Sequence, residues 1–192
     1  MALKYLNDFK EELAFFDNYN GNLLTAFKDV EKTGNVQLIT CNATHGFLPL
    51  MKINPKAVHA QIAIGVKAFE ERMGDHPKGM WLAESGYYPE LDKELAMQDL
   101  NFFFVDSHGL WYADVPPHYD VYRPVITPSG VFVFARDPES SEQIWSAQLG
   151  YPGDSNYREF YRDVGFDRPF DYIRPYVDPS GVRTNTGIKY HK

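Results

Sequence analysis

The sequence predicts an α/β protein built on parallel strands, of the barrel or open-sheet type. Short β-rich segments alternate with segments of helical periodicity, an order that favours parallel strands joined by right-handed crossovers. Reactive or strongly polar residues follow four successive strands, which is where barrels and open α/β sheets place their active sites. The composition, with 44% hydrophobic and 23% charged residues in 192, is that of an ordinary globular protein.

The first 34 residues are predicted to form two N-terminal packing helices. Apolar residues share one face of the first helix because they recur at three-to-four-residue spacing: Tyr5, Leu6, Phe9, Leu13 and Phe16. The second helix covers residues 23–32. Residues 35–192 are assigned to the strands and active-site loops of the same single domain, residues 1–192.

The later elements alternate along the chain. Residues 36–40 (VQLIT) form a predicted strand, and Asn54-Pro55 is a typical helix start for a helix that ends at Gly74. The next predicted elements are a strand at 79–83, a helix at 90–99, a strand at 101–105 and a hairpin of 121–126 and 131–135. Three or four parallel strands cannot close a barrel, so we expect the remainder of a catalytic domain to lie outside this sequence.

Glu84 is the main candidate for chemistry, because it directly follows the hydrophobic strand GMWLA and precedes the turn SGYYP. A carboxylate at a strand end can act as a nucleophile, a general acid or base, or a metal ligand. The alternative is a charge at the start of the next helix, which is about as common from position alone.

Other strand ends supply candidate substrate-binding residues, each with a structural alternative. His45 can donate a hydrogen bond to a sugar hydroxyl or to Glu84, or it can be a structural loop residue. Asp106 and His108 have two functional interpretations, a clamp for substrate hydroxyls and a metal half-site, and one structural interpretation, an Asx turn. Arg136 and Asp137 orient a carboxylate or form a structural ion pair.

Aromatic residues make up 16% of the chain, and many of the Tyr and Trp residues lie in segments rich in Gly and Pro. Such rings suit sugar stacking, because a pyranose offers an apolar face and a hydroxylated rim. Trp145 and Tyr151, in the loop predicted from residue 137 to 154, are candidate stacking residues, and so is Trp81. Ordinary packing of helices and loops is the alternative.

Several function classes are disfavoured by the sequence. The net charge of −7 and the pI near 5.3 argue against nucleic-acid and anionic-membrane partners. No apolar run approaches the ~20 residues of a membrane span, and the single cysteine, Cys41, fits a reducing compartment, so we expect a cytoplasmic protein. The sequence contains no zinc motif, no G-x-S-x-G and no phosphate loop. Carboxylate chemistry among aromatic residues remains, and it favours glycosides.

Six segments resemble glycoside hydrolase family 57, and specifically its 1,4-α-glucan branching enzymes: ITCNATHGFLPL, WLAESGYYPEL, FFFVDSHGL, ARDPESSEQIWSAQLGYPGD, YREFYRD and TGIKYH. The resemblance covers nearly all of residues 36–192. It implies part of a distorted TIM-like (β/α)7 barrel that acts on α-glucans, in glycogen-type metabolism, by a retaining mechanism without a cofactor or metal. It places the nucleophile at Glu84 and the active-site His of the A-T-H motif at His45.

The sequence departs from the family pattern in three places. The N-terminal strand with its His-x-Pro motif is replaced by an acidic helix, and Ser85 stands where many relatives carry Cys, a change that we expect to be tolerated. No segment matches the family's acid/base motif, so we expect this chain alone to be inactive. Retaining enzymes need two carboxyl groups about 5 Å apart. Asp106 is interpreted as shaping the substrate pocket and not as the second carboxyl group.

Two alternatives from other classes stay open at this point. One alternative to the α-glucan enzyme is a non-catalytic glucan-binding piece. The other is a metal-dependent carbohydrate deacetylase, since His45, Asp106 and His108 can bind a divalent ion. The absence of an H-x-x-x-H motif counts against the deacetylase.

Overall fold

A computed structural model describes residues 2–154, 156, 158–159, 162–177, 180–188 and 190–191. Two compact units are present, one formed by residues 12–137 and the other by residues 1–11 together with 138–192. The boundary near the N-terminus falls within helix α1 (Ala2–Asn18). The presence of α1 confirms the first predicted helix. The assignment of residues 1–192 to a single domain stays a prediction, and the two units are described separately.

The larger unit contains a mainly parallel five-stranded sheet in the order β1-β2-β3-β5-β4. β1 (Thr40–Cys41), β2 (Gly79–Trp81), β3 (Phe102–Val105) and β5 (Phe132–Ala135) are parallel neighbours. β4 (Val125–Ile126) pairs antiparallel with β5 as the predicted hairpin. The sheet is open, with β1 and β4 at its edges, which confirms the predicted α/β class with an incomplete barrel.

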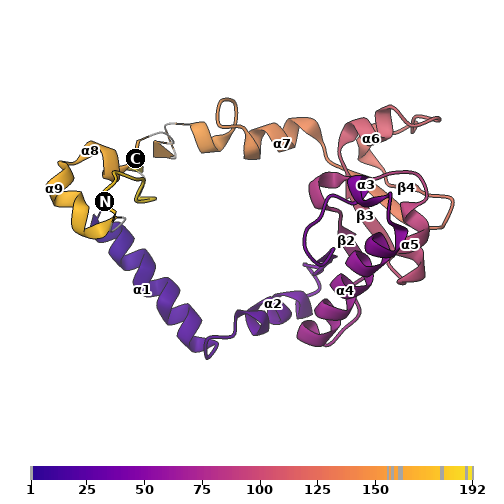
Figure 1. Cartoon of the computed structure of the whole chain (residues 1–192), viewed down its shortest axis with the longest axis horizontal. Helices are drawn as coiled ribbons and strands as arrows, with labels where there is room; N and C mark the ends of the chain where they lie inside the picture. The colour runs from indigo at the N-terminus through magenta and orange to yellow at the C-terminus, as the bar shows by residue number, and fades with distance from the viewer. Residues whose placement is uncertain are drawn as a thin grey trace. The chain divides into compact units, whose positions relative to one another are not determined.

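One face of the sheet carries the hydrophobic core beneath a layer of helices (Figure 1). These are α3 (Leu48–Met51), α4 (Pro55–Met73), α5 (Leu91–Met97) and α6 (Ser107–Trp111). Successive strand residues point to opposite faces, so alternate residues of β2, β3 and β5 enter this core. The fully or almost fully buried residues include Leu48, Val58, Ile62, Val66, Met80, Leu91, Leu95, Phe103, Val105, Leu110 and Val133.

The other face of the sheet carries aromatic side chains. The rings of Trp81 and Phe104 lie 6.1 Å apart, and Phe104 lies 5.9 Å from Phe134. Phe132 and Phe134 remain 46% and 39% exposed. Apolar residues on both faces are typical of parallel strands that are covered on both sides, as in a barrel.

The helix boundaries follow the local signals closely. Asn54 caps α4 by accepting a hydrogen bond from the Ala57 amide, Pro55 stands at its first position, and Gly74 ends it in the left-handed conformation at φ +84°. α2 (Leu23–Lys32) also has the predicted bounds, with Asn22 as its cap.

The first strand differs from its prediction, because the structure has β1 at Thr40–Cys41 and not at residues 36–40. The Leu38 amide donates a 2.8 Å hydrogen bond to the Glu31 carboxylate on α2. That amide is therefore committed to a side chain rather than to a neighbouring strand, so the strand begins later. The other strands are likewise shorter than predicted at one or both ends.

The smaller unit contains short elements. These are α7 (Pro138–Trp145), η3 (Tyr151–Gly153), α8 (Val164–Asp167), α9 (Phe170–Ile173), η4 (Arg174–Tyr176) and the antiparallel pair of β6 (Arg158–Glu159) and β7 (Tyr190–His191). The prediction of a loop from residue 137 to 154 is wrong for residues 138–145, which are helical because Pro138 begins a run without further Pro or Gly. The segments YREFYRD and TGIKYH lie partly outside the described residues.

Asp163 organises this unit as a buried carboxylate. It accepts hydrogen bonds from the backbone amides of Gly165, Thr186 and Gly187 and from the Thr186 hydroxyl, at 2.8–3.0 Å. Burial opposes ionisation, but these donors outweigh it and hold the pKa of Asp163 below its ordinary value.

No helix in the described part of the chain is both long and apolar enough to cross a membrane.

Asp92 plays the corresponding part in the larger unit, where it is 3% exposed and joins α5 to the turn between β4 and β5. It accepts hydrogen bonds from the Ser129 amide at 3.1 Å and from the Tyr87 hydroxyl at 3.4 Å. Burial works against the charge, but the donors of Ser129 and Thr127 outweigh it and lower the pKa of Asp92. Burial, the charge of Asp92 and this hydrogen bond together raise the pKa of Tyr87 to about 12.

Asp92→Asn is expected to lower the free energy of unfolding at pH 7 by about 1–2 kcal/mol, because the charged acceptor is lost. The folded pKa of Asp92 lies below its ordinary value of 3.8, so its stabilisation is present above that pH and disappears as the pH falls through the folded pKa. Urea unfolding at several pH values measures both effects. Asp99→Asn, at an exposed position, is the control; equal acid dependence in Asp92→Asn and wild type would contradict the prediction.

Candidate active site

Glu84 lies in a strained 3-10 turn, η1 (Ala83–Ser85), which is separated from the end of β2 by Leu82. Glu84 and Ser85 have φ values of +53° and +54°, a left-handed conformation that is rare for residues other than glycine and asparagine. The Ser85 amide donates to the Leu82 carbonyl and the Gly86 amide donates to the Ala83 carbonyl, at 2.9 and 3.0 Å. These bonds hold the turn and leave the Glu84 side chain 79% exposed.

Gly86 fixes the other side of this turn by close approach. A Cβ atom at this position would lie 2.4 Å from the ring of Phe47. The turn therefore packs against the segment that follows the His45 loop, which brings two distant parts of the sequence together.

His45 lies next to Glu84, as the sequence predicted. Its Nε2 atom is 3.6 Å from Oε1 of Glu84, close enough for an ion pair and slightly too long for a hydrogen bond. His45 also has a positive φ, +55°. The helix-start alternative for Glu84 is not supported, because α5 begins at Leu91 with Glu90 as its capping residue.

Glu84 also lines a cavity of about 720 Å³ at the carboxyl ends of the strands. Asp106 and His108 line the same cavity, whose walls are largely apolar and aromatic, with Phe47, Tyr87, Phe103, Tyr112 and Val133 among them. This size and this mixture are common in ligand sites. Tyr112, which is 85% exposed, is not among the predicted site residues, although it lies in the aromatic segment HGLWYADVPP.

Arg136 and Asp106 form an ion pair across the ends of β5 and β3. Arg136 Nη1 lies 3.2 Å from Asp106 Oδ1, and both side chains are partly exposed. The Asp106 side chain does not cap α6. The carboxylate is therefore oriented by Arg136, which fits a residue that shapes the pocket.

The other predicted substrate-binding residues lie in different places. Trp81 is on the aromatic face of the sheet, opposite the face whose side chains line the cavity. Asp137 lies two residues after the end of β5 and is the last residue of the larger unit. Trp145 and Tyr151 belong to the smaller unit, where they are 76% and 50% exposed. Their part in binding stays a prediction.

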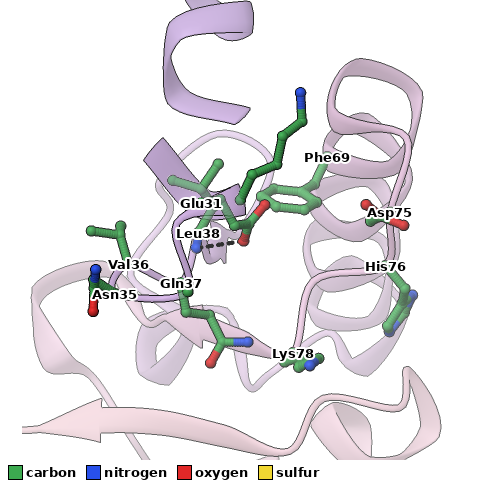
Figure 2. Close-up of a pocket in the computed structure, with 11 residues that line it drawn as sticks. Glu31, Asn35, Val36, Gln37, Leu38, Phe69, Asp75, His76 and Lys78 are labelled. Atoms are coloured by element: carbon green, nitrogen blue, oxygen red, sulfur yellow. Dashed lines mark hydrogen bonds between the residues drawn. The ribbon is translucent and has the colours of Figure 1, made fainter. Parts of the chain in front are cut away.

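A second cavity, of about 670 Å³, lies among residues 31–38 and 75–78, which precede β1 and β2 (Figure 2). Phe69 and His76 line it, together with the Glu31 carboxylate that binds the Leu38 amide. None of the predicted site residues contributes to it. It is at the amino ends of the strands, away from Glu84.

Among the described residues, no group of three or more His, Cys, Asp or Glu side chains is arranged to hold a metal ion. The metal-dependent deacetylase therefore has no ligand set within the part of the chain that the structure describes.

Comparison with known proteins gives consistent matches. The model of glycosyl hydrolase family 57 matches residues 2–192. A 1,4-α-glucan branching enzyme of Thermococcus kodakarensis is 36% identical, over 84% of this chain and 28% of the relative. A probable 1,4-α-glucan branching enzyme of Mycobacterium tuberculosis is 32% identical, over 82% of this chain and 30% of the relative.

Solved structures give the same result. The α-amylase AmyC from Thermotoga maritima is 59% identical, with a TM-score of 0.91 over 100% of this chain and 37% of that protein. The branching enzyme from Pyrococcus horikoshii is 30% identical, with a TM-score of 0.72 over 95% of this chain and 35% of that protein.

The chain spans about a third of the length of these relatives, between 28% and 37%. The family model nevertheless covers the chain from residue 2 to its last residue, and the motifs around His45 and Glu84 meet in space as the family resemblance implies. The chain belongs to glycosyl hydrolase family 57.

Proposed function

We propose that this chain carries the nucleophile of a retaining enzyme that acts on α-glucans, and that the leading activity is 1,4-α-glucan branching. The observation that carries the proposal is the Glu84 carboxylate, held exposed at a strand end, lining a cavity and lying 3.6 Å from His45. Membership of the family and relatives named as branching enzymes or an α-amylase support the substrate class.

In the proposed mechanism the Glu84 carboxylate attacks the anomeric carbon of a glucosyl unit, and the bond to the leaving glucan oxygen breaks. His45 helps to orient the carboxylate or a sugar hydroxyl beside it. A glucan 6-hydroxyl then attacks the anomeric carbon of the glycosyl-enzyme, the bond to the Glu84 carboxylate breaks, and the proton of the hydroxyl passes to the residue that protonated the leaving oxygen. The branch forms with the original configuration, because two inversions have occurred.

The proton donor for the first step is proposed to lie in the part of the relatives that this chain does not span. Asp106 is already paired with Arg136 and is proposed to shape the pocket. His108, Arg136 and Asp137 are proposed to contact the glucan, together with Trp81, Trp145 and Tyr151, in a cytoplasmic enzyme.

Hydrolysis is the second candidate activity, because the relative that is 59% identical is named as an α-amylase. The two activities differ in the acceptor that reaches the glycosyl-enzyme, a glucan hydroxyl or water. Exclusion of water from the closed site would decide between them.

Product analysis separates these activities. The intact protein is incubated with amylose, and new α-1,6 linkages are counted against new reducing ends. Branching is expected to give mainly α-1,6 linkages, whereas a majority of reducing ends would reject branching in favour of hydrolysis. Glucan binding that survives Glu84→Gln, without turnover in the wild type, would instead support a non-catalytic glucan-binding protein.

A further inference from the structure

The loop that carries His45 is tied to helix α4 by one side chain, Gln61. The Gln61 Oε1 atom accepts hydrogen bonds from the Thr44 amide at 3.0 Å and from Asn42 Nδ2 at 3.3 Å. Its Nε2 atom donates to the Thr44 hydroxyl at 2.8 Å. The Gln61 backbone carbonyl also accepts from the Ala43 amide at 2.9 Å. A single residue of α4 thus contacts the three residues that precede His45.

Asn42 completes the attachment from inside the loop. Its side chain is fully buried, and its Nδ2 atom donates a 2.9 Å hydrogen bond to the Gly46 carbonyl. The backbone carbonyl of Asn42 accepts a hydrogen bond from the His45 amide at 3.1 Å. The backbone is therefore fixed on both sides of His45. These bonds hold His45 at its positive φ, a conformation that persists only where the surroundings determine it.

The strand before the loop gives little support, since β1 is only two residues long and lies at the edge of the sheet. The His45 imidazole is half exposed and lies 3.6 Å from Glu84. Its place beside the carboxylate thus depends mainly on the loop backbone, and the loop backbone depends on Gln61.

We propose that Gln61 is a positioning residue, which fixes the His45 loop on α4 and thereby keeps the imidazole beside the Glu84 carboxylate. The kinetic consequence of this proposal rests on the proposed function, whereas its structural consequence does not. Gln61 lies 16 positions from His45 in a helical stretch, and no motif pointed to it.

The structural consequence is tested by NMR on protein with ¹⁵N-labelled histidine, with the His45 ring signals assigned from a His45→Gln variant. In the wild type, Glu84→Gln should shift the His45 ring signals, because the two groups are neighbours. In a Gln61→Met background this response is expected to be lost. Lys67→Met, an exposed change on the same helix, is the matched control and should keep the response.

A conservative variant separates positioning from general loss of structure. In Gln61→Glu the carboxylate can still accept from the Thr44 amide and from Asn42, and the Thr44 hydroxyl can reverse to donate to it. Gln61→Glu should therefore restore the response of His45 to Glu84→Gln. If Gln61→Met keeps the full response, Gln61 does not position His45 and the proposal is overturned.

The kinetic consequence is measured in the intact enzyme on amylose. Gln61→Met is expected to lower kcat roughly 10-fold with little change in KM, because misplacement of a group at the reacting centre acts on the chemical step. Gln61→Glu should recover most of this loss. An inactive wild type would reject the proposed function and leave the NMR result to decide the role of Gln61, whereas unchanged kcat in Gln61→Met would overturn positioning in catalysis.

Discussion

Glu84→Gln is expected to reduce the rate of glucan cleavage and transfer in the intact enzyme by about 10⁴-fold or more, the scale seen when a covalent nucleophile is removed. An amide oxygen is a poor nucleophile towards an anomeric carbon, and it does not carry the negative charge that stabilises an oxocarbenium-like transition state. The change keeps the shape of the side chain. Because Glu84 is 79% exposed, the substitution should leave the stability almost unaltered.

The measurement is the initial rate of amylose conversion at saturating substrate, together with the mass of the peptide that contains residue 84. The wild type should give a glucosylated peptide when the reaction is quenched, and Glu84→Gln should give none. Glu90→Gln is a close control, because Glu90 also has a positive φ and its exposed side chain pairs with Lys93 at 2.8 Å. Equal rates for Glu84→Gln and Glu90→Gln would show that Glu84 is not the nucleophile.

Gly65→Ala is expected to lower the free energy of unfolding of the larger unit by about 3 kcal/mol, the upper part of the range for overpacked sites. Helix propensity alone predicts the opposite sign, because alanine in a helix interior is favoured over glycine by roughly 0.5–1 kcal/mol. At Gly65, however, an added Cβ would lie 2.3 Å from the Cys41 carbonyl oxygen and 3.2 Å from the Asn42 Cα atom. Either α4 or the start of the His45 loop must move.

Urea unfolding followed by tryptophan fluorescence measures this effect. Trp145 belongs to the smaller unit, so a Trp145→Phe background leaves Trp81 and Trp111 as reporters of the larger unit. Ile64→Ala, at an adjacent position that is 55% exposed, should change the stability by less than about 0.5 kcal/mol. A Gly65→Ala protein more stable than the wild type would mean that the close approach does not constrain the helix.

The Gly65 prediction and the Gln61 proposal concern the same loop, the one that carries His45. The Thr40 hydroxyl donates to the Gly65 carbonyl at 2.9 Å, one helical turn from Gln61. Gly65 lets α4 approach the end of β1, and Gln61 then reaches the residues before His45. Gly65→Ala is therefore also expected to disturb the His45 ring signals.

Local sequence signals were most accurate where one residue's backbone preference decides the outcome. Asn54, Pro55 and Gly74 predicted the bounds of α4 because capping and left-handed φ preferences act within a few residues. The prediction for residues 36–40 was wrong over most of its length, because the Leu38 amide binds Glu31, a partner that periodicity cannot reveal.

The sequence by itself predicted the α/β class and the succession of strands and helices along the chain, since hydrophobic periodicity is a local property. It also offered Glu84 and His45 as candidate site residues, from their positions after strands and from the family resemblance. Only the tertiary structure decided that these two side chains meet at 3.6 Å, that Asp106 pairs with Arg136, and that Gln61 holds the His45 loop. The physical reason is that each of these contacts joins residues 17–39 positions apart, and their geometry follows from the packing of α4 and the register of β1, β2, β3 and β5.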